Sequence, residues 1–92
     1  MIMVTVKYFL TEDGKIYFKN WIEKVHSESL KQEGFISLDS QCDEKGNPIA
    51  SLRFLNENLL AAWSSTSQHD ELVNDIEQYC IKPVDVESKL FI

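Results

Sequence analysis

The stretch EGFISLDSQCDEKGNPIASLRFLNENLLAAW, residues 33–63, decides the fold because a helix end, two strands and a helix start follow one another with almost no intervening residues. Gly34 suits the left-handed residue that commonly lies just past a helix C-terminus. Extended runs at about 35–42 and 48–55 flank the turn residues Gly46-Asn47-Pro48. The stretch therefore predicts a helix that ends near Gly34, followed by a β-hairpin.

On the N-terminal side of this stretch the pattern predicts a strand and then a helix. Residues 2–10 are rich in β-branched and aromatic types and carry apolar side chains on both faces of a strand. Thr11-Glu12-Asp13-Gly14 has the composition of a turn. From Lys15 the apolar spacing becomes helical, which predicts an amphipathic helix up to Glu33.

On the C-terminal side the sequence predicts a broken helix and a closing strand. Asn56 is a good N-cap for a short helix over 57–64. After the serine-rich break, a second helical pattern continues through Cys80. Pro83 then opens a last strand from Val84 to Ile92.

The resulting order, β-α-β-β-α-β with the second helix broken, predicts an α+β fold: a ferredoxin-like protomer with an antiparallel four-stranded sheet. Helices can cover only one face of such a sheet. The alternation of Val84, Val86 and Leu90, added to the two-sided first strand, predicts that a second subunit covers the other face. Residues 1–92 are expected to form one domain and a homodimer.

Composition narrows the class of protein. The net charge of -6 argues against a nucleic-acid partner, whose phosphates favour a basic face. No stretch approaches the roughly 20 apolar residues of a membrane span. The N-terminus lacks the features of a signal peptide, so the cytoplasm is the expected location. Cys42 and Cys80 have no metal-site spacing and are expected to be reduced packing residues, and no metal is expected.

The whole chain resembles the antibiotic biosynthesis monooxygenase family. The likeness rests on Glu33-Gly34-Phe35 with the strand Ile36-Ser37-Leu38, on Leu59-Leu60-Ala61-Ala62-Trp63, and on the closing Pro83-Val84-Asp85-Val86. The resemblance implies a dimeric α/β barrel built from ferredoxin-like protomers, and an oxidoreductase activity in some members. None of these segments is a catalytic signature, so each functional residue has to be carried over by itself.

Relatives that oxidise polycyclic phenols without metal or flavin use an Asn and a Trp on the third strand and a Tyr on the following helix. The corresponding residues here are Ala50, Phe54 and Leu60. That polar set is absent from this chain.

Relatives that degrade haem use an Asn on the first strand, a Trp after the third strand and a histidine ligand further on. Trp63 matches the Trp, but Lys7 and Val73 stand in the other two places. Without an imidazole there, a haem iron has no evident ligand. A third set of relatives carries a histidine in the loop after the short helix, where Gln68 or His69 falls.

Each candidate site residue has two interpretations. Trp63 could stack on a planar ligand, with Phe54 and Trp21 as further walls of the site, or all three could belong to the core. Lys7 could neutralise a phenolate, or simply extend from the rim of the sheet. His69, beside Asp70, could be a general base or an exposed surface residue. The catalytic residues stay unknown, with His69 and Lys7 as candidates.

Two functional classes remain open. In the first, the protein is a cofactor-independent monooxygenase that binds a small electron-rich aromatic, such as a quinol, in a cleft between sheet and helices. The substrate would then supply the electrons, and no cofactor would be needed. In the second, the same dimer binds a small molecule or another protein without turnover.

Overall fold

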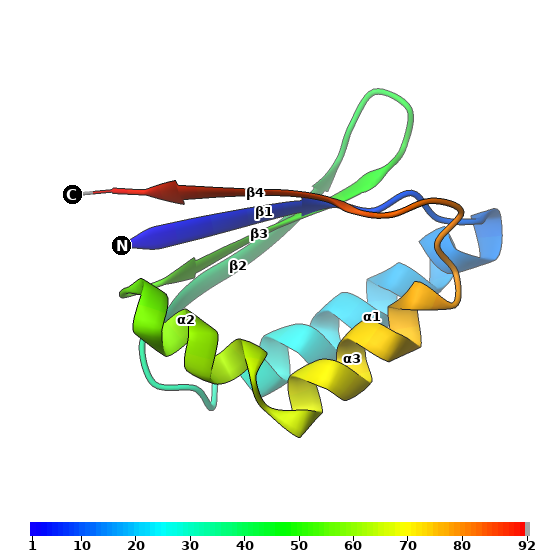
Figure 1. Cartoon of the computed structure of the whole chain (residues 1–92). Helices are drawn as coiled ribbons and strands as arrows, with labels where there is room; N and C mark the ends of the chain where they lie inside the picture. Colours follow the sequence, from blue (N-terminus) through cyan, green and yellow to red (C-terminus); the bar gives the residue numbers. More distant parts are fainter. Residues whose placement is uncertain (92) are drawn as a thin grey trace.

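The computed structural model of the chain describes residues 1–91 and contains four strands and three helices in the predicted order (Figure 1). The elements are β1 (Ile2–Lys7), α1 (Glu12–Ser29), β2 (Phe35–Cys42), β3 (Pro48–Phe54), α2 (Glu57–Ser64), α3 (Ser67–Glu77) and β4 (Asp85–Leu90). The strands lie in the order β2-β3-β1-β4, and every neighbouring pair is antiparallel. The predicted ferredoxin-like α+β fold is confirmed.

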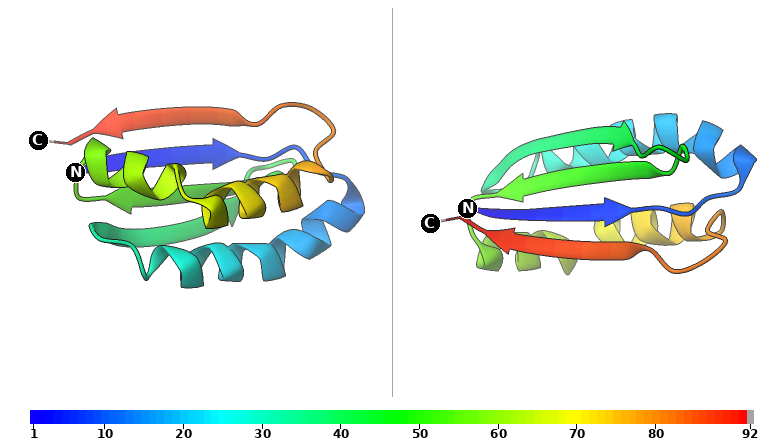
Figure 2. Two further views of the ribbon diagram at one scale, coloured as in Figure 1. Left: turned by 60° about the horizontal axis from the view of Figure 1, so that its bottom comes forward. Right: turned by 90° about the horizontal axis from the view of Figure 1, so that it is seen from above.

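The molecule has two layers, because all three helices lie on the same side of the sheet. Figure 2 shows this from the helix side and from above, where the other face of the sheet is uncovered. The core between the layers has two parts. Leu10, Phe18, Trp21 and Ile76 form one cluster, and Ile2, Phe54 and Trp63 form the other.

Helix α1 begins at Glu12, three residues before the start that its apolar spacing predicts. Thr11 is its N-cap, and the Thr11 hydroxyl accepts a hydrogen bond from the backbone N–H of Gly14 at 3.0 Å. Glu12 and Asp13 then lie in the first turn, where the helix dipole favours acidic side chains. The segment predicted as a turn is therefore a helix start, and turn and cap residues have the same composition.

The other end of α1 is also displaced from its predicted position. The helix ends at Ser29, and its C-cap is Leu30 in a right-handed conformation. Gly34 does have a positive φ of 83°, but it lies in the loop that leads into β2. Its carbonyl accepts a hydrogen bond from the N–H of Leu55 at 2.8 Å, which fixes the loop beside the end of β3.

Gly34→Ala is expected to destabilise the protein more than Gly46→Ala does. Both glycines have a positive φ, which costs an alanine roughly 1–2 kcal/mol. At Gly34 a new Cβ would also meet the Leu59 side chain, with its Cβ at 3.0 Å, whereas at Gly46 its nearest neighbour is the Lys15 amine at 3.9 Å. Urea unfolding of both variants isolates the cost of crowding. Equal losses of stability would show that Leu59 moves aside freely.

The outer strands differ from their predicted form. β1 ends at Lys7, and Leu10 only forms an isolated bridge with Cys80. β4 begins at Asp85, and Ile92, predicted to end it, lies outside the described residues.

The apolar residues of β4 lie on the helix side of the sheet rather than on its open face. The register pairs Val86 with Val6 and Leu90 with Ile2, and both β1 residues face the helices. The interpretation of the β4 alternation as a surface for a facing subunit was therefore wrong. Because side chains alternate along a strand, the opposite face of β4 receives Asp85, Glu87 and Lys89 instead.

The open face of the sheet is polar and its charges are balanced. Arg53 donates to Asp39 on the neighbouring strand at 2.9 Å and to the Ser37 hydroxyl at 3.2 Å, so its acidic partner lies in the same chain. In the β1–β4 register, Lys7 stands opposite Asp85. Within residues 1–91, no helix has the length and apolar character that crossing a membrane requires.

Candidate functional site

A cavity of about 160 Å³ lies between the sheet and the helices. β1, β2 and β3 supply its floor, and all three helices contribute to its walls. Its lining is mostly aliphatic and aromatic, as is typical of small-molecule sites. The lining residues are Val4, Val6, Tyr8, Trp21, Ile22, Val25, Leu38, Ala50, Leu52, Leu60, Trp63, Ser64, His69 and Leu72.

Trp63 belongs both to the cavity wall and to the core. Its side chain is 1% exposed and packs with Ile2 and Phe54. It reaches this position because Asn56 caps α2, with its side chain accepting from the N–H of Leu59 at 2.9 Å. Both interpretations of Trp63 thus describe the same residue, since one part of the indole lines the cavity and the rest is packed.

His69 faces the cavity from the first turn of α3. The Thr66 hydroxyl caps this helix and accepts from the His69 backbone N–H at 3.2 Å. The imidazole packs edge-on against the Trp63 indole, with ring centroids 5.4 Å apart. Its Nδ1 is buried and has no hydrogen-bond partner within residues 1–91.

Burial lowers the pKa of His69, and the nearby Asp70 carboxylate opposes this in part. A pKa below the usual 6.5 means that the ring is mostly neutral at pH 7. A neutral imidazole has one nitrogen that accepts a hydrogen bond or a proton. His69 therefore gives a largely apolar cavity a neutral imidazole, whose buried Nδ1 has no hydrogen-bond partner among residues 1–91.

Tyr8 is a second polar group of the cavity, and the sequence interpretation did not single it out. Its ring packs against Phe18 and Trp21, with centroid distances of 5.3 and 5.5 Å. Burial raises the pKa of its phenol well above the usual range, and the charge of Cys80 adds to the rise. The hydroxyl thus stays protonated and can donate a hydrogen bond. Its position in the same alternating series as Val4 and Val6 is the signal that could have identified it.

Trp21 lies in the cavity wall and in the core, so both interpretations that the sequence left open describe it. Its indole N–H donates to the backbone carbonyl of Leu72 at 2.8 Å, which ties α1 to α3 beside the cavity. Phe54 is completely buried and is not among the cavity-lining residues. It supports Trp63 from behind, through the core cluster that they share.

Lys7 lies away from the cavity and forms an ion pair with Asp43 at 3.3 Å. Asp43 is the anchor of the β2–β3 hairpin, because its side chain accepts from the N–H groups of Lys45 and Asn47 at 2.9 and 2.8 Å. The Asn47 amide is the main cause that lowers the pKa of Asp43 to about 2. The structure thus gives Lys7 a partner in the hairpin and places it on the opposite face of the sheet from Val6.

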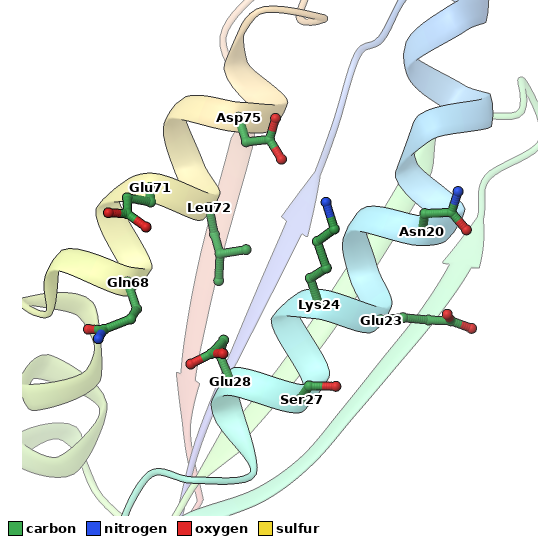
Figure 3. Close-up of a pocket in the computed structure, with 9 residues that line it drawn as sticks. All are labelled: Asn20, Glu23, Lys24, Ser27, Glu28, Gln68, Glu71, Leu72 and Asp75. Carbon is green, nitrogen blue, oxygen red and sulfur yellow. The ribbon is translucent and has the colours of Figure 1, made fainter.

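A larger groove of about 680 Å³ runs between α1 and α3, but its lining is different (Figure 3). Lys24 and Glu28 from α1 and Leu72 from α3 extend into it. Most of its other lining residues are acidic or polar and are exposed to water. The Glu28 carboxylate accepts a hydrogen bond from the Lys31 amine, and the Asp75 carboxylate accepts one from the Tyr17 hydroxyl. Leu72 is the one apolar residue among the described residues that line this groove, whereas the inner cavity is lined mostly by aliphatic and aromatic side chains, so the inner cavity is the candidate site.

The comparisons with known proteins agree on the architecture. No family model matches the chain, and a search of curated proteins finds no match either. Among solved structures, one from Nitrosomonas europaea named as an antibiotic biosynthesis monooxygenase has a TM-score of 0.88 and 14% identity, over 100% of this chain and 99% of that one. The chain shares the fold of the antibiotic biosynthesis monooxygenases.

Two further structures of this fold carry other descriptions. SnoaB of Streptomyces nogalater, described as a cofactor-independent oxygenase, matches with a TM-score of 0.86 and 5% identity, over 98% of this chain and 91% of that one. A protein of Bacteroides thetaiotaomicron, of unknown function and described as a possible oxidoreductase, matches with a TM-score of 0.77 and 22% identity, over 98% and 96%. At these identities the likeness concerns the backbone arrangement alone.

We expect that the purified protein does not bind haem stoichiometrically. A cavity of about 160 Å³ is far too small for a porphyrin, and Val73 stands where haem-degrading relatives place their ligand. Among residues 1–91, no group of three or more His, Cys, Asp or Glu side chains could hold a metal ion. A haem titration followed at the Soret band checks this. A sharp stoichiometric shift would contradict the prediction, and its loss in His69→Ala would identify His69 as the ligand.

Proposed function

We propose that the protein is a cofactor-independent monooxygenase of a small electron-rich aromatic, such as a phenol or quinol. The observation that carries the proposal is the pairing of a ring-sized apolar cavity with the unsatisfied Nδ1 of His69. An engineered apolar cavity of about 150 Å³ in another protein binds benzene, so a volume of about 160 Å³ suits one aromatic ring.

In this mechanism His69 is the general base. It takes the phenolic proton of a ring held against Trp63, and the electron-rich phenolate then reduces oxygen. One oxygen atom forms a bond to a ring carbon that loses its hydrogen, and the other leaves as water. All four electrons come from the substrate, which becomes a quinone. Tyr8, kept protonated, donates a hydrogen bond to the oxygen that gains charge.

The second candidate function is binding without turnover. It is favoured by the apolar residues Ala50, Phe54 and Leu60, which stand where phenol-oxidising relatives place Asn, Trp and Tyr. An oxygen electrode distinguishes the two functions. With quinol present, an enzyme consumes oxygen above the rate of autoxidation, in proportion to protein. Binding seen by calorimetry without such oxygen consumption would leave only the second function.

We further propose a homodimer in which the open sheet faces pack together. The helices leave this face uncovered, and its balanced charges, with Lys7, Arg53 and Lys89 against Asp39, Asp85 and Glu87, can pair across a two-fold axis. A stable interface buries about 1,200–2,000 Å² in total. Because the face is polar, we expect a dimer that weakens at high salt.

Sedimentation velocity at micromolar concentration tests the dimer. Thr5→Arg, near the middle of the open face, is expected to shift the protein toward monomer, whereas Ile16→Arg on the exposed side of α1 is the matched control. A wild-type protein that sediments only as monomer would contradict the proposal. Equal effects of the two variants would place the interface elsewhere.

A further inference from the structure

A second, open groove of about 600 Å³ lies between β4 and α3, next to the inner cavity. The two spaces share four lining residues: Val4, Val6, Tyr8 and His69. Val4 and Val6 are successive inward-facing residues of β1, so the floor of one space continues into the other. The rings of Tyr8 and His69 stand at the junction.

The outer groove is apolar although it is open. Val86 on β4 is 60% exposed, and Val73 on α3 is 41% exposed. Pro83, Val84 and Ile76 extend the same surface. Its charged residues are Glu77 and Lys82, and the Lys82 amine lies over the Phe9 ring at 4.0 Å from the centroid.

This apolar strip needs an occupant different from that of the open sheet face. Every residue of β4 is exposed, and the strip lies on the helix side of the strand. A facing sheet would cover the polar side that carries Glu87, so it would leave Val84 and Val86 in water. Exposed apolar patches bounded by polar residues mark sites of interaction.

We propose that the ligand is a single aromatic ring with an unbranched apolar tail. The ring lies in the inner cavity beside Trp63, and the tail passes between Tyr8 and His69 into the groove along β4 and α3. The volumes fit this division, since the inner space suits one ring and the outer space is several times larger. This inference rests on the proposed function for the ring site, and it adds the tail.

The test uses phenol and a series of 4-alkylphenols up to 4-octylphenol, which resist autoxidation, with dissociation constants measured by calorimetry. If the tail is buried in the groove, affinity rises about three- to fourfold for each added methylene until the groove is filled. A tail left in water would give no such rise. Affinity that is independent of tail length would overturn the inference while leaving the ring site intact.

Two variants locate the tail. Val73→Glu and Val86→Glu place a charge on the groove from its opposite sides, and both residues are exposed, so folding is expected to be unchanged. They are expected to flatten the dependence on tail length and to leave the affinity for phenol itself unchanged. Ile16→Glu makes the same change on an exposed residue of α1, outside both spaces, and is expected to have no effect.

The outcomes separate the two proposals. A dependence on tail length that persists in both groove variants would overturn the groove as the tail site. A second copy of the chain would be shown to cover the groove if Val86→Glu abolished the dimer and the wild type showed no dependence on tail length. That result would also overturn the groove as the tail site. Failure of the shortest phenols to bind, or binding that Trp63→Phe leaves unchanged, would instead overturn the ring site on which the proposed function depends.

Discussion

Trp63→Ala is expected to lower the free energy of unfolding by about 3–5 kcal/mol, because truncating a buried Trp loses its contacts and leaves a cavity. Trp63 is 1% exposed and, with Ile2 and Phe54, forms the buried part of one core cluster. In a domain of this size each kcal/mol corresponds to roughly 4–8 °C in melting temperature. Urea and thermal unfolding measure the loss.

Trp63→Phe separates the packing role of this residue from a role in binding. A phenyl ring preserves much of the buried volume and still presents an aromatic edge to the cavity, so we expect a smaller loss of stability. If Trp63 stacks on the ligand, the affinity for phenol falls in Trp63→Phe and falls further in any folded Trp63→Ala protein. A melting temperature that is unchanged in Trp63→Ala would contradict the packing that the structure shows.

The order of the elements was predictable because several local signals agree with the overall topology. The change from a period of two to a helical period near residue 15 and the turn at Gly46 fix the alternation of strands and helices. The boundaries were less predictable. Thr11 and its acidic neighbours are equally good in a turn and in a helix cap, and only the hydrogen bond to Gly14 decides between them.

The face on which β4 packs could not be read from β4 alone. Alternation shows that Val84, Val86 and Leu90 share a side, but the pairing with β1 decides which layer that side meets. The sequence pattern also predicted apolar side chains on both faces of β1, whereas Thr5 and Lys7 are polar residues on its open face. The open face therefore has less apolar surface than the sequence predicted, which weakens that argument for a second subunit.

The candidate site was predictable in part. Trp63 and Trp21 each had two interpretations, cleft wall and core, and both residues line the cavity and belong to core clusters. Lys7 was a candidate because a lysine amine can neutralise a phenolate, but the residue type does not show on which face of the strand the side chain lies. Tyr8 was missed because a tyrosine at a strand end looks like ordinary core. Tyr8 becomes a candidate site residue only because the fold places it in the lining of both spaces, together with His69.

Removing the imidazole is expected to reduce turnover by about 10²–10⁴-fold, the usual contribution of a positioned general base. His69→Asn is the variant of choice, because an amide fills part of the space and keeps a polar atom near Nδ1 but does not take up a proton. Gln68→Asn, one residue earlier and exposed, is the matched control. Quinol-dependent oxygen uptake measures the effect. Activity that is equal in the two variants would exclude His69 as the base.

The pH dependence of turnover distinguishes a role of His69 as the base from a purely structural role. The neutral imidazole is the active form, and burial lowers the pKa of His69 from the usual 6.5. The acid limb of kcat/KM is therefore expected to have its midpoint below pH 6.5 and to disappear in His69→Asn. A midpoint above 6.5, or a limb that persists in the variant, would assign the proton to another group.

The free energy of unfolding is expected to fall on acidification, as turnover does, because both depend on the neutral form of His69. In the unfolded chain His69 takes up a proton near pH 6.5, whereas in the folded protein it does so only at lower pH, so the unfolded state binds more protons between these values. The stability contributed by the buried neutral ring is thus present above about pH 6.5 and is lost as the pH falls toward the folded pKa. Urea unfolding at pH 7.5 and 5.5 is expected to show a smaller loss on acidification in His69→Asn than in wild type. A ligand that binds only when the His69 ring is neutral is expected to lose affinity as the pH falls through the same range. Binding, turnover and stability would then all depend on the protonation of this one side chain.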